Sequence, residues 1–153
     1  MNRRGFLGAA LAVPFAARAH KPAPLPVAAR IAKRYSVAPL AVEWVAALAA
    51  RGFPEDPALI LAIIGVESSW RPWAVGAAGE VGLCQVRPDL HGASAAELVN
   101  IDDNVATAAK VLRQCFVRSG GDVLRAVARY NGAGPTARRY ARKVLVERKR
   151  IIG

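Results

Sequence analysis

One carboxylate, Glu67, ends a long run of apolar residues near the middle of the chain. The run from Leu59 to Val66 is apolar on every side, which is typical of a helix buried inside a domain. An acid at the C-terminal end of such a helix has a raised pKa, because the terminal carbonyl groups and the loss of water disfavour its ionised form. A carboxyl group that keeps its proton can act as a general acid, so Glu67 is the first candidate for catalysis. The alternative is that Glu67 forms an ion pair with Arg71.

The segment after Glu67 could form one wall of a binding site. It contains three glycines between Gly76 and Gly82, which suit tight turns, and then Gln85, whose amide both donates and accepts hydrogen bonds. Short Val and Leu pieces between the glycines predict a small β-hairpin flap or an irregular loop. Gln85 would then face a substrate, unless its amide serves backbone groups of the loop instead.

The residues from Glu67 to Pro88 resemble a known signature. Its form is E-S-x-[FW]-x-P-x-A…G-x-x-G-L-M-Q-[IV]-x-P, found in the soluble lytic transglycosylases, goose-lysozyme-like enzymes that cleave peptidoglycan. About a dozen positions agree at fixed spacing, which makes the match more specific than a short motif. The agreeing residues are Glu67-Ser68-Ser69-Trp70, Pro72, Ala74, Gly79, Gly82-Leu83, Gln85-Val86 and Pro88.

Three positions in the same segment depart from the family pattern. Cys84 stands where the family usually has Met, Gly76 where it has Ser, and Glu80 where Ala is frequent. None of these changes removes the acid. The missing Ser puts one hydrogen bond to the substrate in question.

The C-terminal half extends the resemblance to about Leu145. The stretch from Asn104 to Asp122 is similar to the family's core helix, and Asp122 should cap a further helix over residues 123–129. The hexapeptide Tyr130-Asn131-Gly132-Ala133-Gly134-Pro135 resembles the family's A-Y-N-A-G-P. It could also be a plain helix-terminating turn.

The resemblance implies a fold and a set of site residues. The fold is mainly α, a lysozyme-like single domain of the goose type with a small β-hairpin flap beside the catalytic helix. Glu67 is implied to be the catalytic acid, and the family's Tyr, here Tyr130, to face it across the groove. The implied substrate-binding residues are Ser68, Gln85, Tyr130 and Asn131.

The implied reaction is cleavage of the β-1,4 bond between N-acetylmuramic acid and N-acetylglucosamine, with 1,6-anhydro ends as the product. Glu67 would protonate the glycosidic oxygen and then deprotonate the muramic 6-hydroxyl. One rival is a lysozyme-type hydrolase, for which Glu80 is the candidate second carboxylate. Another is a non-catalytic wall-binding adaptor of a secretion or conjugation system.

The first 19 residues have the layout of a cleaved export signal. Arg3-Arg4 precede an apolar run, and Ala17-Arg18-Ala19 offers a small-x-small cleavage site. The Arg pair followed by Gly5-Phe6-Leu7 resembles a twin-arginine signal, although a general secretory signal is an alternative. An apolar run of about 12 residues is too short to span a membrane, so we expect a periplasmic protein with no stable membrane insertion.

The charge of the chain points to an anionic partner. The formal net charge is +11, and loss of residues 1–19 would remove three arginines and no acids, leaving +8. An exported protein meets little nucleic acid, so we expect attraction to peptidoglycan glycan strands and their carboxylates.

The 153 residues fit one globular domain over residues 20–153, with a lead-in and two helices in 20–58 and the catalytic region in 59–153. The expected helices are Val27–Tyr35 and Pro39–Arg51, with Trp44 in the core. Asp56 should cap the central helix, and Thr136–Arg150 should form a basic helix that buries Tyr140 and Val144.

The two cysteines, Cys84 and Cys115, fall in segments that we expect to pack together. In an exported chain they could form a disulfide, and two buried thiols are the equal alternative. His91 has no second His at a ligand spacing. We therefore expect neither a metal nor another cofactor.

Overall fold

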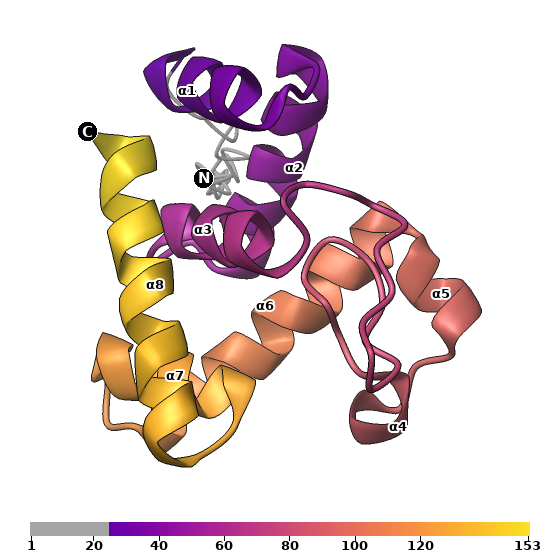
Figure 1. The fold of residues 1–153 in the computed structure, drawn as a ribbon, viewed down its shortest axis with the longest axis vertical. Helices are drawn as coiled ribbons and strands as arrows, with labels where there is room; N and C mark the ends of the chain where they lie inside the picture. Colours follow the sequence, from indigo (N-terminus) through magenta and orange to yellow (C-terminus); the bar gives the residue numbers. More distant parts are fainter. Residues whose placement is uncertain (1–24) are drawn as a thin grey trace, which may run out of the picture.

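The computed structural model of the protein describes residues 25–153, which form a helical domain (Figure 1). The expected mainly α fold is confirmed, whereas residues 1–19 and most of the lead-in lie outside the described part. No helix of that part is long and apolar enough to span a membrane. The helices are α1 (Leu25–Tyr35), α2 (Pro39–Gly52), α3 (Pro57–Glu67), α4 (Pro88–His91), α5 (Ala95–Val99), α6 (Ile101–Arg118), α7 (Val123–Asn131) and α8 (Gly134–Ile152).

Helix α3 is the centre of the domain. Every residue from Leu59 to Gly65 is buried, so the helix has no solvent face, as its apolar sequence predicts. It packs against α2, α6 and α8, and Figure 1 shows it between α8 and α2. The absence of a side chain at Gly65 lets Tyr35 of α1 pack close, because a Cβ there would collide with the tyrosine hydroxyl. The site at the end of α3 therefore stands on a rigid base.

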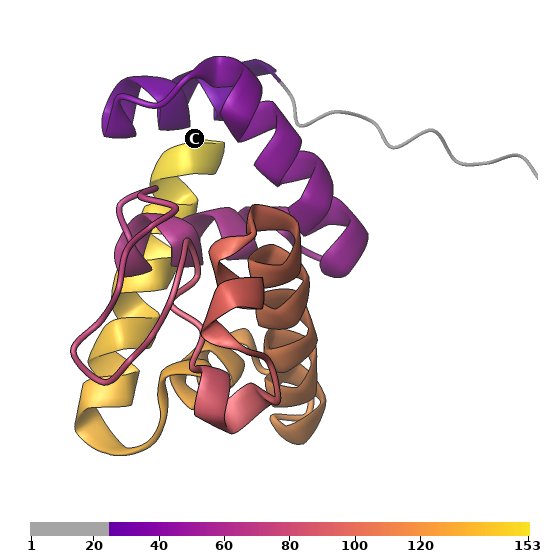
Figure 2. The same ribbon diagram turned by 90° about the vertical axis from the view of Figure 1, so that its right-hand side faces the viewer.

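The segment from α3 to α4 is an irregular loop rather than the predicted β-hairpin (Figure 2). Residues 25–153 contain no strand, and this loop has only two isolated antiparallel bridges, Val75 to Val81 and Val81 to Val86. The backbone takes positive φ angles of 79° at Gly82 and 48° at Gln85. These left-handed positions turn the chain before a regular ladder can extend, so the irregular-loop alternative holds.

A buried asparagine on α6, Asn104, holds this loop in place. Its side-chain nitrogen donates to the carbonyls of Val81, at 2.8 Å, and Leu98, at 2.9 Å, and its oxygen accepts from the Cys84 amide at 2.8 Å. A Cβ at Gly82 would collide with this side chain, so the loop needs glycine there for contact as well as for conformation. All three hydrogen bonds lie away from water, which makes each costly to lose.

Two expectations for the N-terminal half are wrong. Trp44 is 47% exposed, because the buried stripe of α2 passes through Val42, Val45 and Ala49 and leaves residue 44 outside it. Asp56 makes no capping hydrogen bond at the start of α3. Its carboxylate instead pairs with Arg148 Nε at 2.7 Å, which ties the start of α3 to α8.

The two cysteines are buried free thiols in the structure. The hypothesis of a disulfide between Cys84 and Cys115 therefore has no support from the fold. Burial raises the pKa of Cys84 far above its ordinary value, so this thiol is protonated and unreactive at neutral pH.

Replacing Asn104 should loosen the loop and destabilise the domain. We expect Asn104→Ala to lower the free energy of unfolding by about 2 to 4 kcal/mol, because it leaves buried backbone groups without partners. Urea unfolding followed by circular dichroism measures this. Gln114→Ala, on the exposed side of the same helix, is the control and should change stability by less than about 0.5 kcal/mol. Equal unfolding midpoints for the two variants would contradict the role of Asn104.

Candidate active site

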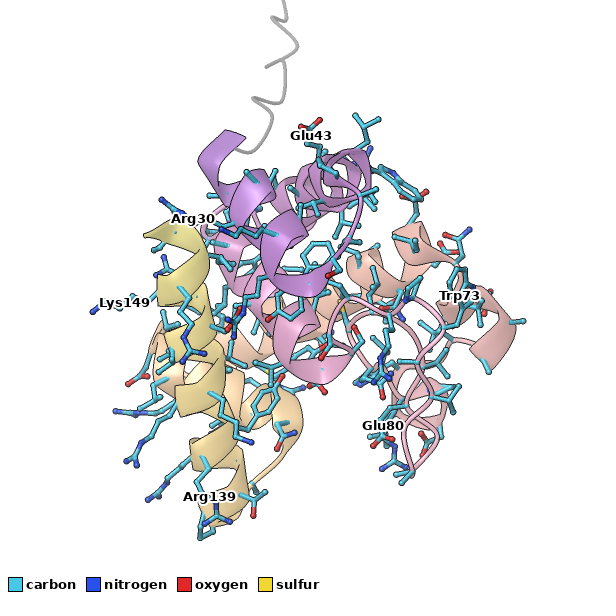
Figure 3. The ribbon with its side chains drawn as sticks, turned by 45° about the horizontal axis from the view of Figure 1, so that its top comes forward. Arg30, Glu43, Trp73, Glu80, Arg139 and Lys149 are labelled. Atoms are coloured by element: carbon cyan, nitrogen blue, oxygen red, sulfur yellow. The ribbon has the colours of Figure 1, made fainter. Side chains whose placement is uncertain are left out.

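A cleft of about 390 Å³ opens at the C-terminal end of α3. It brings together side chains from α3, the loop after it, and α7, which are far apart in the sequence. Figure 3 shows one of them, Glu80, on the loop. Of the residues predicted from the sequence, the cleft collects Glu67, Glu80, Gln85, Tyr130 and Asn131.

Glu67 is the last residue of α3 and is half-buried in this cleft. Within residues 25–153 it has no ion-pair partner, and Arg71 donates to the Ser68 carbonyl at 2.9 Å instead. Burial raises the pKa of Glu67, a hydrogen bond from Tyr140 opposes the rise, and the nearby Glu80 carboxylate adds to it. The direction of the pKa shift agrees with the prediction from sequence, and the ion-pair alternative has no support.

The partner of Glu67 is Tyr140 on α8. The tyrosine hydroxyl donates to Glu67 Oε1 at 2.6 Å. Burial raises the pKa of Tyr140 well above its ordinary value, so its hydroxyl keeps the proton that it donates. The sequence pattern predicts Tyr140 on an apolar helix face and does not indicate this role. The available signal was that a buried tyrosine needs a partner for its hydroxyl.

Tyr130 lies in the cleft but contacts the loop. Its hydroxyl donates to the carbonyl of Cys84 at 3.0 Å rather than to Glu67. Burial raises the pKa of Tyr130 well above its usual range, so this hydrogen bond persists at neutral pH. Tyr130 therefore braces the loop wall, and Tyr140 takes the direct contact with the acid.

Gln85 combines the two roles that the sequence left open. Its side-chain nitrogen donates to the carbonyls of Ala74 and Gly82, at 3.0 and 2.9 Å, so this end of the amide serves the loop. The same residue lines the cleft. Its amide oxygen accepts no hydrogen bond from residues 25–153, so it is the end that can accept one from a ligand.

Two of the three departures from the family signature meet in space. A Cβ at Gly76 would overlap the Glu80 carboxylate, whose Oε2 accepts a hydrogen bond from the Ala78 amide at 3.0 Å. The carboxylate thus fills the room where a serine side chain at position 76 would begin. Where the family signature has a serine hydroxyl, this chain has the Glu80 carboxylate, which lies in the same cleft as Glu67.

Of the two remaining predicted site residues, one lies outside the cleft and one lines it. Ser68 is fully buried and its hydroxyl donates to the Ile64 carbonyl at 3.1 Å, so it lies outside the cleft. Asn131 is exposed at the end of α7 and lines the cleft. Arg87 and His91 also line the cleft, although no sequence motif assigns them to it. No group of three His, Cys, Asp or Glu side chains within residues 25–153 is placed to hold a metal ion.

This geometry supports proton transfer by a single carboxyl group. A protonated Glu67 can donate to a leaving oxygen, and the Tyr140 hydrogen bond stabilises the carboxylate that remains. Residues 45–151 match the family model of the transglycosylase SLT domain, which covers every residue of the cleft. No match was found among the curated proteins.

The raised pKa of Glu67 should appear in the pH dependence of stability. At low pH the group is protonated in both the folded and the unfolded chain, so it imposes no cost. As pH rises through the unfolded pKa of about 4.3, the unfolded state ionises first and the folded state loses stability relative to it. Glu67→Gln has no ionisable group at this position and does not lose this stability. The free energy of unfolding of the variant minus that of the parent should therefore be larger at pH 7 than at pH 4. The same difference at both pH values would contradict the shift.

Proposed function

The chain belongs to the transglycosylase SLT domain family, and from this premise we propose that it is a peptidoglycan lytic transglycosylase. It would cut the β-1,4 bond between N-acetylmuramic acid and N-acetylglucosamine and leave 1,6-anhydro ends. The observation that carries the proposal is the half-buried Glu67, which lines the cleft and accepts a hydrogen bond from Tyr140.

In the proposed first step Glu67 protonates the glycosidic oxygen. Tyr140 occupies Oε1 with its own hydrogen bond, so Oε2 is the oxygen that would carry the proton toward the sugar. The bond from the anomeric carbon to the leaving oxygen breaks, and the leaving sugar departs as an alcohol. The carboxylate left behind keeps the Tyr140 hydrogen bond, which stabilises it at the stage when it is charged.

In the second step the Glu67 carboxylate takes the proton of the muramic 6-hydroxyl. That oxygen forms a bond to the anomeric carbon and closes the 1,6-anhydro ring, so the acid is regenerated and no water enters. Both reacting atoms belong to one sugar, which gives the step the entropic advantage of an intramolecular reaction. One carboxyl group therefore suffices for the whole reaction.

Three other residues support the proposal by their position in the cleft. The free amide oxygen of Gln85 and the exposed side chain of Asn131 offer hydrogen bonds to a glycan, and Tyr130 braces the wall that carries Gln85. Ser68 is left out of the substrate-binding set because its hydroxyl is buried and used within α3.

The cell wall as substrate fits the proposed location. We propose that residues 1–19 direct export to the periplasm, where a basic domain meets the carboxylates of the wall. A small enzyme of this kind would suit a secretion or conjugation system that needs local openings in the wall. The rival hypothesis, a wall-binding adaptor, has no need of a carboxyl group with a raised pKa.

A second candidate function is favoured by one observation, the position of Glu80. Its carboxylate lines the same cleft as Glu67 and raises the pKa of that residue. Lysozyme-type hydrolases use a second carboxylate to activate water or to attack the sugar. A hydrolase with Glu67 as acid and Glu80 as its partner is therefore the alternative.

Removal of the transferable proton should abolish lysis. We expect Glu67→Gln to lower the rate of wall solubilisation by roughly 10²-fold or more, because the amide keeps the shape but cannot act as an acid. Dye release from labelled sacculi measures this rate. Glu43→Gln, the same change on α2 far from the cleft (Figure 3), is the control. Equal lysis by Glu67→Gln and the parent would favour the adaptor.

The chemical form of the cleaved ends distinguishes a lytic transglycosylase from a lysozyme-type hydrolase. Digestion of purified murein in oxygen-18 water should give 1,6-anhydromuramyl ends without label, because the new bond comes from the sugar's own 6-hydroxyl. A hydrolase would give reducing ends with the label on the anomeric carbon. Mass spectrometry of the fragments shows either result, and predominantly labelled reducing ends would transfer the assignment to Glu67 and Glu80 together.

A further inference from the structure

The cleft continues beyond Glu67 onto the basic face of α8. A second depression of about 330 Å³ shares Glu67 and Asn131 with the cleft and is lined on its far side by Arg139 and Lys143. A third depression shares these two cations and adds Arg142. We call Arg139, Arg142 and Lys143 the cationic shelf. It begins beside the acid and continues along α8.

The shelf carries positive charge that the protein itself does not neutralise. All three side chains are exposed, and none has an ion-pair partner within residues 25–153. The acid nearest along the helix, Glu147, is buried and already pairs with Arg34 at 2.7 Å and Arg150 at 3.5 Å. Glu147 also lines the third depression, but its ion pairs are with Arg34 and Arg150 and not with the shelf.

The spacing of the shelf works against the stability of α8. Arg139 lies three residues before Arg142 and four before Lys143, so its charge lies next to each of theirs on the helix surface. Like charges at this spacing destabilise a helix by a few tenths of a kcal/mol per pair. A group that supplies negative charge from outside would relieve this repulsion.

We propose that the cationic shelf binds the carboxylates of the peptide stem on the muramic acid at the cleavage site. The inference rests on the proposed function, because that function places a muramic residue against Glu67. In peptidoglycan each such residue carries a peptide with free carboxylates, and the depression that leaves Glu67 along α8 is the adjoining space with matching charge. Two guanidinium groups and one ammonium group match carboxylates in geometry and sign.

The cationic shelf would thus make the protein bind peptidoglycan with peptide stems in preference to peptidoglycan without them. Figure 3 shows Arg139 on α8 and Glu80 on the loop, well apart. Glycan would be held on the loop side by neutral groups such as Gln85, and the peptide on the α8 side by charge. Wall whose stems have been removed would keep the first set of contacts and lose the second.

The experiment measures binding by cosedimentation with intact sacculi and with sacculi stripped of their stems by an amidase. The Glu67→Gln protein is used so that the wall is not cut. It should bind stem-bearing wall about fivefold more tightly or better, since each exposed ion pair changes affinity by a factor of about two to five. The preference should shrink as salt screens the charges.

The test variant carries Arg139→Gln and Arg142→Gln in the Glu67→Gln protein. The matched control carries Arg138→Gln and Lys149→Gln in the same protein. The control removes the same charge from exposed cations of α8 that form no ion pair within residues 25–153 and line neither shelf depression. The shelf variant should lose the preference for stems and the control should keep it. Circular dichroism checks the fold, and Arg142→Gln alone serves if the double change unfolds α8.

Three outcomes would overturn the proposal. The shelf variant could retain the preference for stems, it could lose affinity equally for stripped wall, or the parent could bind vesicles of anionic phosphatidylglycerol more tightly than stem-bearing wall. Because the readout is binding, it is independent of catalysis. A stem preference that depends on the shelf, in a protein that cuts no murein, would refute the proposed function alone.

Discussion

The hydrogen bond from Tyr140 to Glu67 joins the two helices on which the site depends. Helix α3 is buried along almost its whole length, so its position is fixed by close packing and its last residue cannot move without disturbing the core. Helix α8 packs along α3 and is tied to its start through Arg148 and Asp56. The acid and its hydrogen-bond donor therefore meet because two long helices are held together at both ends.

The loop that forms one wall of the cleft is held by hydrogen bonds rather than by close packing of helices. It has no regular strand and only a few backbone hydrogen bonds, such as the reciprocal pair between Val81 and Val86. Side chains that reach into it add to these, namely Asn104 from α6 and Tyr130 from α7. An irregular loop of this kind can change its lining without losing its anchor. The Glu80 carboxylate, which lies against Gly76, contributes charge to the cleft and takes no part in the Asn104 hydrogen bonds, so the lining and the anchor use separate residues.

The sequence predicted features that depend on neighbouring residues. The buried α3, the position of Glu67 at its end and the cap of α7 by Asp122 follow from local patterns, and the structure has all three. Tyr140 was missed as a site residue because its partner lies 73 positions away. Ser68 was misplaced because a family motif gives the order of residues but not the side on which each one lies. The β-hairpin was predicted wrongly because a segment of Val and Gly residues does not show at which positions the backbone φ angle becomes positive.

In the proposed reaction, the charges around Glu67 allow substrate binding and proton transfer without conflict. A cation close to the acid would lower its pKa and remove the proton that the proposed first step needs. Burial is the largest cause of the raised pKa of Glu67, and the cause is local to the end of α3. Arg139 and Lys143 are exposed and surrounded by water and salt, so their effect on the buried carboxyl group is weak. An anionic substrate that covers these cations would weaken it further, and would thereby favour the protonated acid at the moment when the proton is needed.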